Sequence, residues 1–350
     1  MKLIKTGKKI SSLRGGPALS WPGRGERVLR NPETGDWTFE GRGPLGHAVL
    51  EEESEYGTRS PGENMLILGE NLFSLNALAD GFEGKVGLIY IDPPFNTGSR
   101  QRAYADTFNR PLWLSMMEER LREAWRLLSE NGSMYVHLDS NEVHYAKVLM
   151  DQLFGTGAFQ REITWRIGWT SGFKSSARNY IRNHDTILYY TKSEKPVFNK
   201  IYLPYPPGYE RRKGAAGRGL PMEDTWNCSE GDTLHSIQIK SFSKEKTGFQ
   251  TQKNEDLLWR IISVSSNPGD LVLDFFSGSG TTASAAHKLG RRWIACEADR
   301  KTVELSVERL KRVVDGRDPY GITKKTNWKG GGGFSLLSVK LEDGNNRGLA

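Results

Sequence analysis

The chain has 350 residues, of which 37% are hydrophobic, and its 49 Lys and Arg against 42 Asp and Glu give a formal net charge of +7. The mean hydropathy is −0.57, and no apolar run approaches the length of a membrane span, which argues against a membrane partner. Residues 1–5 lack the apolar core of a signal peptide, so we expect a cytoplasmic protein. A chain of 350 residues is long enough to bury a full α/β core.

The two cysteines, Cys228 and Cys296, have no metal-ligand spacing and indicate a reducing interior. We interpret both as structural. The six histidines form no His-x-x-x-His pattern, and we predict no metal site.

Residues 1–61 show no clear period and are rich in Gly, Pro, Arg and Glu, which predicts an N-terminal arm or a small appended element. Residues 62–192 then alternate between strand and helix patterns. The predicted strands are 65–68, 86–91, 133–138, 163–166 and 186–191. The predicted helices are 72–79, 112–129 and 142–154, and Asn131-Gly132 is expected to stop the second of them.

A stiff tetrapeptide, Asp92-Pro93-Pro94-Phe95, follows the apolar strand 86–91. The prolines fix φ and remove two backbone donors, so the loop presents carbonyl groups. The aromatic ring offers a stacking face and the Asp offers an acceptor. Such a combination at the carboxyl end of a strand could grip a planar group that carries an amine, such as a nucleobase.

Positive charge concentrates between residues 161 and 220, which hold twelve Lys or Arg against four Asp or Glu, together with ten aromatic residues. Basic residues interleaved with aromatics suit phosphate neutralisation and base contacts, although a solvated loop beside core aromatics is the alternative. The polar loop 96–110 adds further arginines. The candidate nucleic-acid contacts are Arg100, Arg102, Trp169, Lys174, Arg178, Arg182, Arg211, Arg212, Lys213 and Arg218.

Residues 193–249 break the α/β rhythm and are predicted to be an insertion. The rhythm resumes over 250–341, with helices at 254–265, 281–289 and 300–314 and strands at 271–275 and 293–297. Partial alternation over 334–341 predicts an edge strand, and 342–350 form a tail. Alternating strands and helices imply a Rossmann-like, doubly wound and mostly parallel sheet, which brings the strand ends to one rim.

A second segment with chemical meaning spans residues 271–282, where an apolar strand leads into a glycine turn and a helix. Glycines at alternate positions, Gly278 and Gly280, let a ligand approach the backbone closely. The spacing differs from the dinucleotide pattern G-x-G-x-x-G, because Thr281-Thr282 follow the second glycine. Taken alone, this turn is a weak signal.

The two segments together resemble the amino-methyltransferases of DNA, which transfer a methyl group from S-adenosylmethionine (SAM) to adenine or cytosine. Asp92 to Phe95 looks like their catalytic tetrapeptide, and residues 276–280 look like their F-x-G-x-G cofactor loop. The catalytic segment precedes the cofactor segment, a permuted order that resembles the β-class and in particular the Mod subunits of type III restriction-modification systems. The resemblance covers residues 62–341 and implies the SAM-dependent methyltransferase fold.

The resemblance also implies roles for individual residues. Asp274 would contact the SAM ammonium, Glu297 the ribose hydroxyls and Glu70 the region of the adenine. Lys253 would pair with the SAM carboxylate, although Asn254 stands where the family usually has Pro. The remaining cofactor-loop residues are Phe276, Ser277, Gly278, Ser279, Gly280 and Thr281.

The tetrapeptide implies a mechanism for amine methylation. Asp92 and the Pro93 carbonyl would accept the two amine hydrogens, which aims the nitrogen lone pair at the SAM methyl, and the carboxylate would stabilise the charge that develops. Phe95 would stack on the base, which must be flipped out of the duplex. A D-x-N-E segment, Asp139 to Glu142, is expected to build the pocket wall. Trp165 and Trp169 either flank the base or pack in the core.

Asp rather than Ser as the first tetrapeptide residue favours adenine N6 as the target, and cytosine N4 is the alternative. An RNA methyltransferase and a non-catalytic nucleic-acid-binding protein are further alternatives. The expected partners are double-stranded DNA, a second copy of the chain and a separate restriction endonuclease subunit, while a stand-alone modification enzyme fits as well. Residues 193–249, with loop 167–183, are the candidate target-recognition region.

Overall fold

The computed structural model of the protein describes most of the chain. The described residues are 18–31, 36–41, 45–58, 64–97, 99–100, 105–106, 109–166, 178–203, 205, 217, 219–226 and 244–342. Among these residues, no helix is both long and apolar enough to cross a bilayer.

Within the described residues, ten strands form one large sheet in the spatial order β13-β9-β10-β8-β5-β14-β15-β4-β16-β3. The run from β8 to β16 is parallel, whereas β10 beside β8 and β3 beside β16 are antiparallel. This arrangement confirms the predicted mostly parallel sheet. The strands are β3 Ala48–Gly57, β4 Asn64–Leu68, β5 Val86–Ile91, β8 Leu128–Leu138, β9 Phe159–Arg166, β10 His184–Thr191, β13 Thr225–Trp226, β14 Leu271–Asp274, β15 Arg292–Glu297 and β16 Gly333–Leu341.

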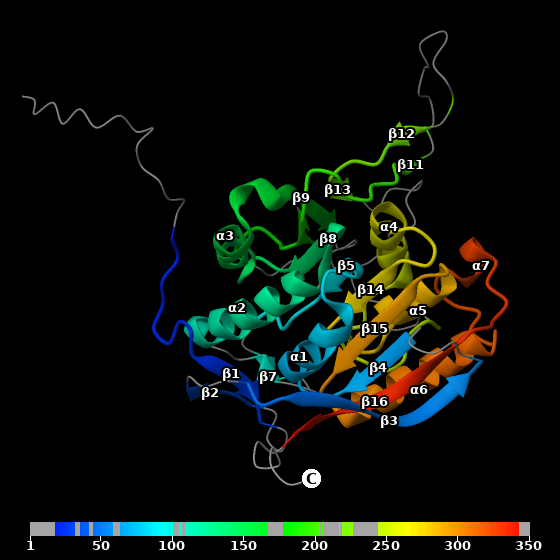
Figure 1. Ribbon diagram of the computed structural model, residues 1–350. Helices are drawn as coiled ribbons and strands as arrows, with labels where there is room; N and C mark the ends of the chain where they lie inside the picture. The colour runs from blue at the N-terminus through cyan, green and yellow to red at the C-terminus, as the bar shows by residue number, and fades with distance from the viewer. Residues whose placement is uncertain are drawn as a thin grey trace, which may run out of the picture.

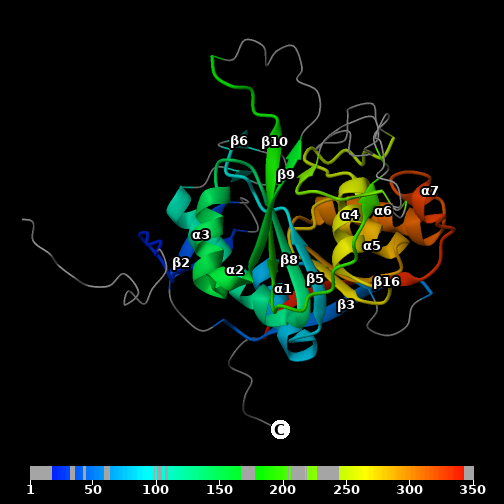
Figure 2. The same cartoon turned by 90° about the horizontal axis from the view of Figure 1, so that it is seen from above.

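Helices cover both faces of this sheet, so the protein has three layers (Figure 2). On one face lie α1 (Asn71–Phe82), α2 (Arg110–Leu127) and α3 (Val143–Phe154). On the other lie α4 (Glu255–Ser265), α5 (Thr281–Lys288) and α6 (Arg300–Val314), and the short α7 (Thr323–Thr326) follows α6. Strands covered on both faces must be apolar throughout, which explains why Val86–Ile91 reads as a continuous hydrophobic run.

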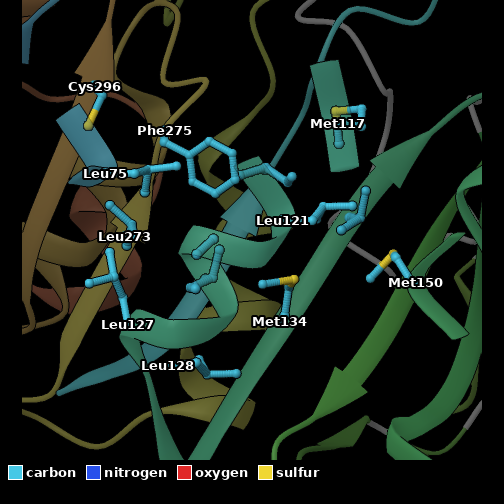
Figure 3. Packing of buried hydrophobic residues seen from close by; sticks show 14 of the residues in the cluster. Leu75, Met117, Leu121, Leu127, Leu128, Met134, Met150, Leu273, Phe275 and Cys296 are labelled. Atoms are coloured by element: carbon cyan, nitrogen blue, oxygen red, sulfur yellow. The ribbon is translucent and has the colours of Figure 1, made fainter. Parts of the chain in front are cut away.

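The core between the sheet and the first helix layer is made of aliphatic, methionine and aromatic side chains. Figure 3 shows how α2 residues such as Leu121 and Leu127 meet Met134 of β8 and Leu273 of β14. Cys296 of β15 is fully buried in the same cluster, and this burial raises the pKa of its thiol. An inert buried thiol agrees with the structural role predicted for it.

The topological switch point lies between β5 and β14, which are neighbours in the sheet. From β5 the chain runs through α2 to β8 on one side. From β14 it runs through α5 to β15 on the other side. The two segments singled out in the sequence therefore end on adjacent strands, at the place where open α/β sheets bind their ligands.

Smaller strand pairs surround the sheet. The hairpin of β1 (Arg27–Arg30) and β2 (Trp37–Gly41) packs on α2, as Figure 1 shows, and Trp21 just before it donates a 2.8 Å hydrogen bond to Ser115 of α2. The other pairs are β6 (Ser99–Arg100) with β7 (Ala105–Asp106) and β11 (Tyr202–Leu203) with β12 (Leu220–Pro221).

Two local predictions were wrong. The strand at 334–341 is not an edge strand, because β3 pairs along its outer side. The helix predicted to reach residue 129 ends at Leu127, and Leu128 begins β8 opposite Val86 of β5. In both places long-range pairing, which local periodicity does not report, decides the structure.

The boundaries 1–61, 62–192, 193–249, 250–341 and 342–350 stay predictions. The structure adds that β3, within the predicted N-terminal arm, joins the main sheet through β16. It also places β13, within the predicted insertion, in parallel pairing with β9.

Candidate active site

A row of acids marks the carboxyl-terminal rim of the sheet. Five neighbouring parallel strands, β8, β5, β14, β15 and β4, end at or just before an acidic residue. In spatial order these acids are Asp139, Asp92, Asp274, Glu297 and Glu70. So many carboxylates on one rim need compensation by cations or hydrogen-bond donors, and the partners differ from one acid to the next.

Asp92 lies at the centre of this row, directly after β5. Pro93 and Pro94 are buried, and the Pro94 carbonyl accepts a 2.8 Å hydrogen bond from Nε1 of the buried Trp113 on α2. This bond fixes the loop and commits the Pro94 carbonyl. Asp92 Oδ1 is buried, and among the described residues nothing donates a hydrogen bond to it.

Lys253 contacts the other oxygen of Asp92. Its ammonium forms an ion pair with Asp92 Oδ2 and lies 5.1 Å from the centroid of the Phe95 ring. The Lys253 carbonyl accepts a 3.2 Å hydrogen bond from Thr281 at the start of α5. Asn254 caps α4 by accepting from the Leu257 amide at 2.9 Å, so the residue that replaces the family's Pro has a structural role.

The glycine turn between β14 and α5 is held by its neighbours. Gly278 and Gly280 have φ values of +51° and +72°, which favour glycine. A Cβ on Gly278 would lie 3.0 Å from the Phe249 ring, so the turn is also close-packed. The Gly278 carbonyl accepts from Ser306 at 2.8 Å. Ser277 Oγ is buried and has no hydrogen-bond partner among the described residues.

Asp274 at the end of β14 is almost fully buried, with 3% of its surface exposed. Its two oxygens accept from the Phe276 amide at 3.0 Å and from the Thr282 hydroxyl at 2.5 Å. In the part of the chain that the structure describes, Asp274 forms no ion pair. Desolvation, with smaller contributions from Asp92 and Glu297, raises its pKa from 3.8 to about 7.

The acids after β15 and β4 are already engaged. Glu297 accepts from the backbone amides of Gly278 at 3.1 Å and Asp299 at 2.9 Å, and desolvation raises its pKa. Glu70 caps α1 by accepting from the Leu72 amide at 2.7 Å, and it forms an ion pair with the fully buried Arg120 of α2. The carbonyl of Val28 in the N-terminal hairpin also accepts from Arg120, at 3.1 Å.

A buried ionic network supports the glycine turn from behind. Glu255 accepts from Lys288 and from Arg309, both at 2.8 Å, and all three side chains are almost completely buried. Arg309 also donates to the Thr281 hydroxyl at 2.8 Å. Sequence reasoning missed this network, because its members lie on α4, α5 and α6 and share no local motif.

A second missed feature lies beneath the tetrapeptide. The hydroxyl of Tyr90 lies 2.8 Å from His137 Nδ1, and His137 Nε2 lies 3.2 Å from Asp185. Burial lowers the pKa of His137 to about 3, so the ring is neutral. Its centroid is 5.7 Å from that of Phe95. The only signal in the sequence was a His inside the apolar strand 133–138.

The D-x-N-E segment positions the residue after the tetrapeptide. Asn96, in the left-handed region at φ 57°, donates to Glu142 at 2.7 Å, and Arg110 donates to the same carboxylate at 3.0 Å. The wall role expected for the segment stays a prediction. Trp165 is fully buried and packs 5.4 Å from the His137 ring, so it belongs to the core.

Of the candidate nucleic-acid contacts, the structure places three. Arg178 and Arg182 are exposed on the segment that leads into β10, and Arg182 forms an ion pair with Asp185. Because β10 is antiparallel to β8, this segment lies on the same rim as Asp92. Arg100 is in β6, where the backbone is described. Outside the described residues lie Arg102, Trp169, Lys174, Arg211, Arg212, Lys213 and Arg218.

The rim has the polar groups that SAM requires. SAM presents an ammonium, a carboxylate and two ribose hydroxyls. The rim offers Asp274, which forms no ion pair among the described residues, together with Lys253 and the further acids Glu297 and Glu70. The unpartnered Ser277 hydroxyl and the two left-handed glycines agree with a turn that a ligand approaches closely. Among the described residues, no cluster of three or more His, Cys, Asp or Glu could hold a metal.

Comparison with known proteins identifies this arrangement. A model of the N6/N4 methyltransferase family, described as DNA methylase, matches residues 86–308, which include both the tetrapeptide and the glycine turn. The chain belongs to this family.

Two curated relatives and one solved structure illustrate the relationship. A probable type III restriction-modification enzyme HindVI Mod subunit from Haemophilus influenzae is 28% identical, and the alignment covers 83% of this chain but 55% of that protein. The DNA adenine methyltransferase YhdJ of Escherichia coli is 28% identical over 64% of this chain and 76% of its own. The PvuII DNA methyltransferase (cytosine-N4-specific) has the same fold, with a TM-score of 0.53 at 19% identity over 79% of this chain and 94% of that one.

Proposed function

We propose that this protein transfers a methyl group from SAM to the N6 amine of adenine in double-stranded DNA, by base flipping and direct in-line transfer. The observation that carries the proposal is the position of Asp92, which ends β5 beside the glycine turn of β14. One of its oxygens is buried and accepts no hydrogen bond from any described residue. A buried acceptor without a donor is costly unless a ligand supplies the donor.

The acceptor pair for the amine is Asp92 with the carbonyl of Pro93. The Pro94 carbonyl is committed to Trp113, so it does not compete for this role. The target nitrogen becomes more positive as the methyl group transfers, and a fixed carboxylate stabilises that charge without reorganising. Phe95, seated on the His137 ring, supplies the stacking face for the base.

The cofactor groups are assigned to the other half of the rim. SAM, when bound, supplies a methyl group that its sulfonium charge has already activated. Asp274 would accept from its ammonium and Glu297 from its ribose hydroxyls, while the glycine turn would form the backbone surface against it. Glu70 is engaged with Arg120, so its contribution near the adenine works through α1 and the pocket shape.

The DNA would reach the rim through Arg178 and Arg182 together with the basic loop 167–183 and residues 193–249. Phosphate contacts from arginines position a duplex, and unstacking the target base exposes its amine to Asp92. Adenine is preferred over cytosine because the tetrapeptide begins with Asp and because a relative named as a DNA adenine methyltransferase aligns with this chain.

The similarity to a Mod subunit supports work within a restriction-modification system, with a separate endonuclease subunit as partner. A second copy of the chain is a further proposed partner. The chain spans 55% of that relative's length, so these partners are inferences from its name.

The test is transfer of labelled methyl from SAM to mixed-sequence duplex DNA, with the methylated nucleoside identified after digestion and Asp92→Ala as control. N6-methyladenine that disappears in the variant is the expected result. N4-methylcytosine would overturn the assignment of the base. Label on structured RNA but not on DNA would overturn the substrate.

A further inference from the structure

Lys253 is the residue that the proposed reaction leaves unexplained. Its ammonium would pair with the SAM carboxylate, yet in the structure it contacts Asp92, the acceptor for the target amine. It also lies 5.1 Å from the Phe95 ring centroid, on the residue where the base would stack. An ammonium is an N–H donor like the exocyclic amine. Lys253 therefore makes both contacts that the target base would make.

We propose that Lys253 is a positioning residue shared between two carboxylates. It pairs with Asp92 in the free enzyme and exchanges to the carboxylate of the cofactor when the cofactor binds, which releases Asp92 for the target amine. The inference rests on the proposed function and adds to it a coupling between cofactor binding and the availability of the catalytic acceptor.

The position of the Lys253 backbone supports this exchange. Its carbonyl is tied to Thr281, which follows the glycine turn, so the root of the side chain moves with the cofactor loop. The ammonium sits on a flexible four-carbon stem that can turn from one partner to another. The backbone of Lys253 is therefore fixed to the cofactor side of the rim, and its ammonium reaches Asp92 on the catalytic side.

Electrostatics supports it as well. The Lys253 side chain is 7% exposed and that of Asp92 is 18% exposed, so the pair is largely desolvated. Separating such a pair is costly unless each charge gains another partner. Asp274, at the end of the neighbouring strand β14, already accepts from Phe276 and Thr282. A carboxylate that arrives with the cofactor gives Lys253 a new partner, and the amine then supplies donors to Asp92.

Calorimetric binding of S-adenosylhomocysteine to the full chain tests the exchange without DNA. This probe carries the amino-acid carboxylate but lacks the sulfonium charge, which Asp92 could attract directly. Asp92→Asn should tighten binding by about tenfold, because the ammonium no longer has to leave a carboxylate, and Lys253→Met should weaken it by about tenfold or more. In the Lys253→Met background, Asp92→Asn should have no effect.

Three controls accompany this double-mutant cycle of Asp92 and Lys253. Lys253→Arg keeps the cation and should retain the dependence on Asp92. Lys246→Met removes an exposed lysine of the same segment and should leave affinity unchanged. Binding of 5′-methylthioadenosine, which lacks the carboxylate, should not respond to Asp92→Asn. Melting temperatures of all variants separate loss of binding from loss of fold.

The outcomes distinguish this proposal from the one beneath it. An Asp92→Asn effect of equal size with and without Lys253 would show a general charge effect and overturn the exchange. An unchanged affinity for S-adenosylhomocysteine in Asp92→Asn, with Lys253 in place, would also overturn the exchange, even if methyl transfer to DNA is observed. A wild-type chain that binds no S-adenosylhomocysteine would overturn both proposals.

Discussion

Asp92 and Asp274 end neighbouring parallel strands on the same rim, but their surroundings differ in kind. Asp274 is 3% exposed and accepts two hydrogen bonds from its own loop. Asp92 is more exposed, with one oxygen on the ammonium of Lys253 and the other without a donor among the described residues. The first acid organises a turn, whereas the second is held by a partner that can leave.

The difference shows how one rim can hold a rigid turn at Asp274 and keep an acceptor available for a ligand at Asp92. A side chain that must accept a new donor during the reaction needs an unsatisfied or exchangeable position, and Asp92 has both. A side chain that must hold a backbone turn needs short bonds within that turn, as Asp274 has. The ionic network of Glu255, Lys288 and Arg309 lies behind the glycine turn that follows Asp274 and stiffens it further.

The largest expected effect comes from removing the charge at the centre of that network. Glu255→Gln removes the buried carboxylate that Lys288 and Arg309 share, and leaves Lys288 with Asp318 and Arg309 with Glu245. It should lower the free energy of unfolding by about 3 kcal/mol or more. Chemical denaturation measures it. The matched control is Glu51→Gln, which breaks the exposed pair with Lys340 and should change stability by less than about 1 kcal/mol. Equal effects of the two variants would contradict a supporting role for the network.

Exchanging the two acids for alanine separates their roles. Asp92→Ala should reduce single-turnover methyl transfer by about 10²–10³-fold, because it removes charge stabilisation. It should also lower the melting temperature, because the largely buried Lys253 loses its ion-pair partner, but it should not weaken cofactor binding. Asp274→Ala should instead lower both stability and cofactor affinity, since the Phe276 amide and the Thr282 hydroxyl lose their acceptor. A stable Asp274→Ala variant with normal cofactor affinity would remove the distinction.

The sequence predicted the two acids from local features, but it did not predict the contacts that come from distant parts of the chain. Both were found because each ends an apolar strand and carries a recognisable loop, features that lie within a dozen residues. Partners from distant segments were not predicted: Lys253 was expected only at the cofactor, and Arg120 and the hairpin carbonyl of Val28 were not expected near Glu70. The strand β16 was misplaced at the edge for the same reason, since β3 precedes it by almost the whole chain.

Because the pKa of Asp274 is raised, both the free energy of unfolding and cofactor affinity should depend on pH. The folded protein holds this proton up to about pH 7, whereas the unfolded chain releases it near 3.8, so this group lowers the free energy of unfolding as pH rises through that window. Only the ionised form attracts an ammonium. The affinity for S-adenosylhomocysteine should therefore rise by about tenfold between pH 6 and pH 8.

Asp274→Asn is the control for this titration. It should bind the probe weakly at both pH values, because it has no proton to lose, and the pH dependence should flatten. A profile that keeps its slope in the variant would assign the titration to another group on the rim, such as Glu297, whose pKa is also raised.

The smallest expected effect concerns the floor beneath Asp92. The neutral His137 ring has one N–H, and Asp185 can only accept, so Nε2 carries the hydrogen and Nδ1 accepts from Tyr90. Tyr90→Phe removes that donor and leaves a buried acceptor unsatisfied, which should lower the free energy of unfolding by about 1–3 kcal/mol. The His137 ring supports Phe95 by contact, without a bond to the reacting groups, so we expect methyl transfer to fall only a few-fold. Denaturation and single-turnover rates measured together test this. A loss of rate as large as that of Asp92→Ala, with stability intact, would instead make Tyr90 and His137 part of the chemistry.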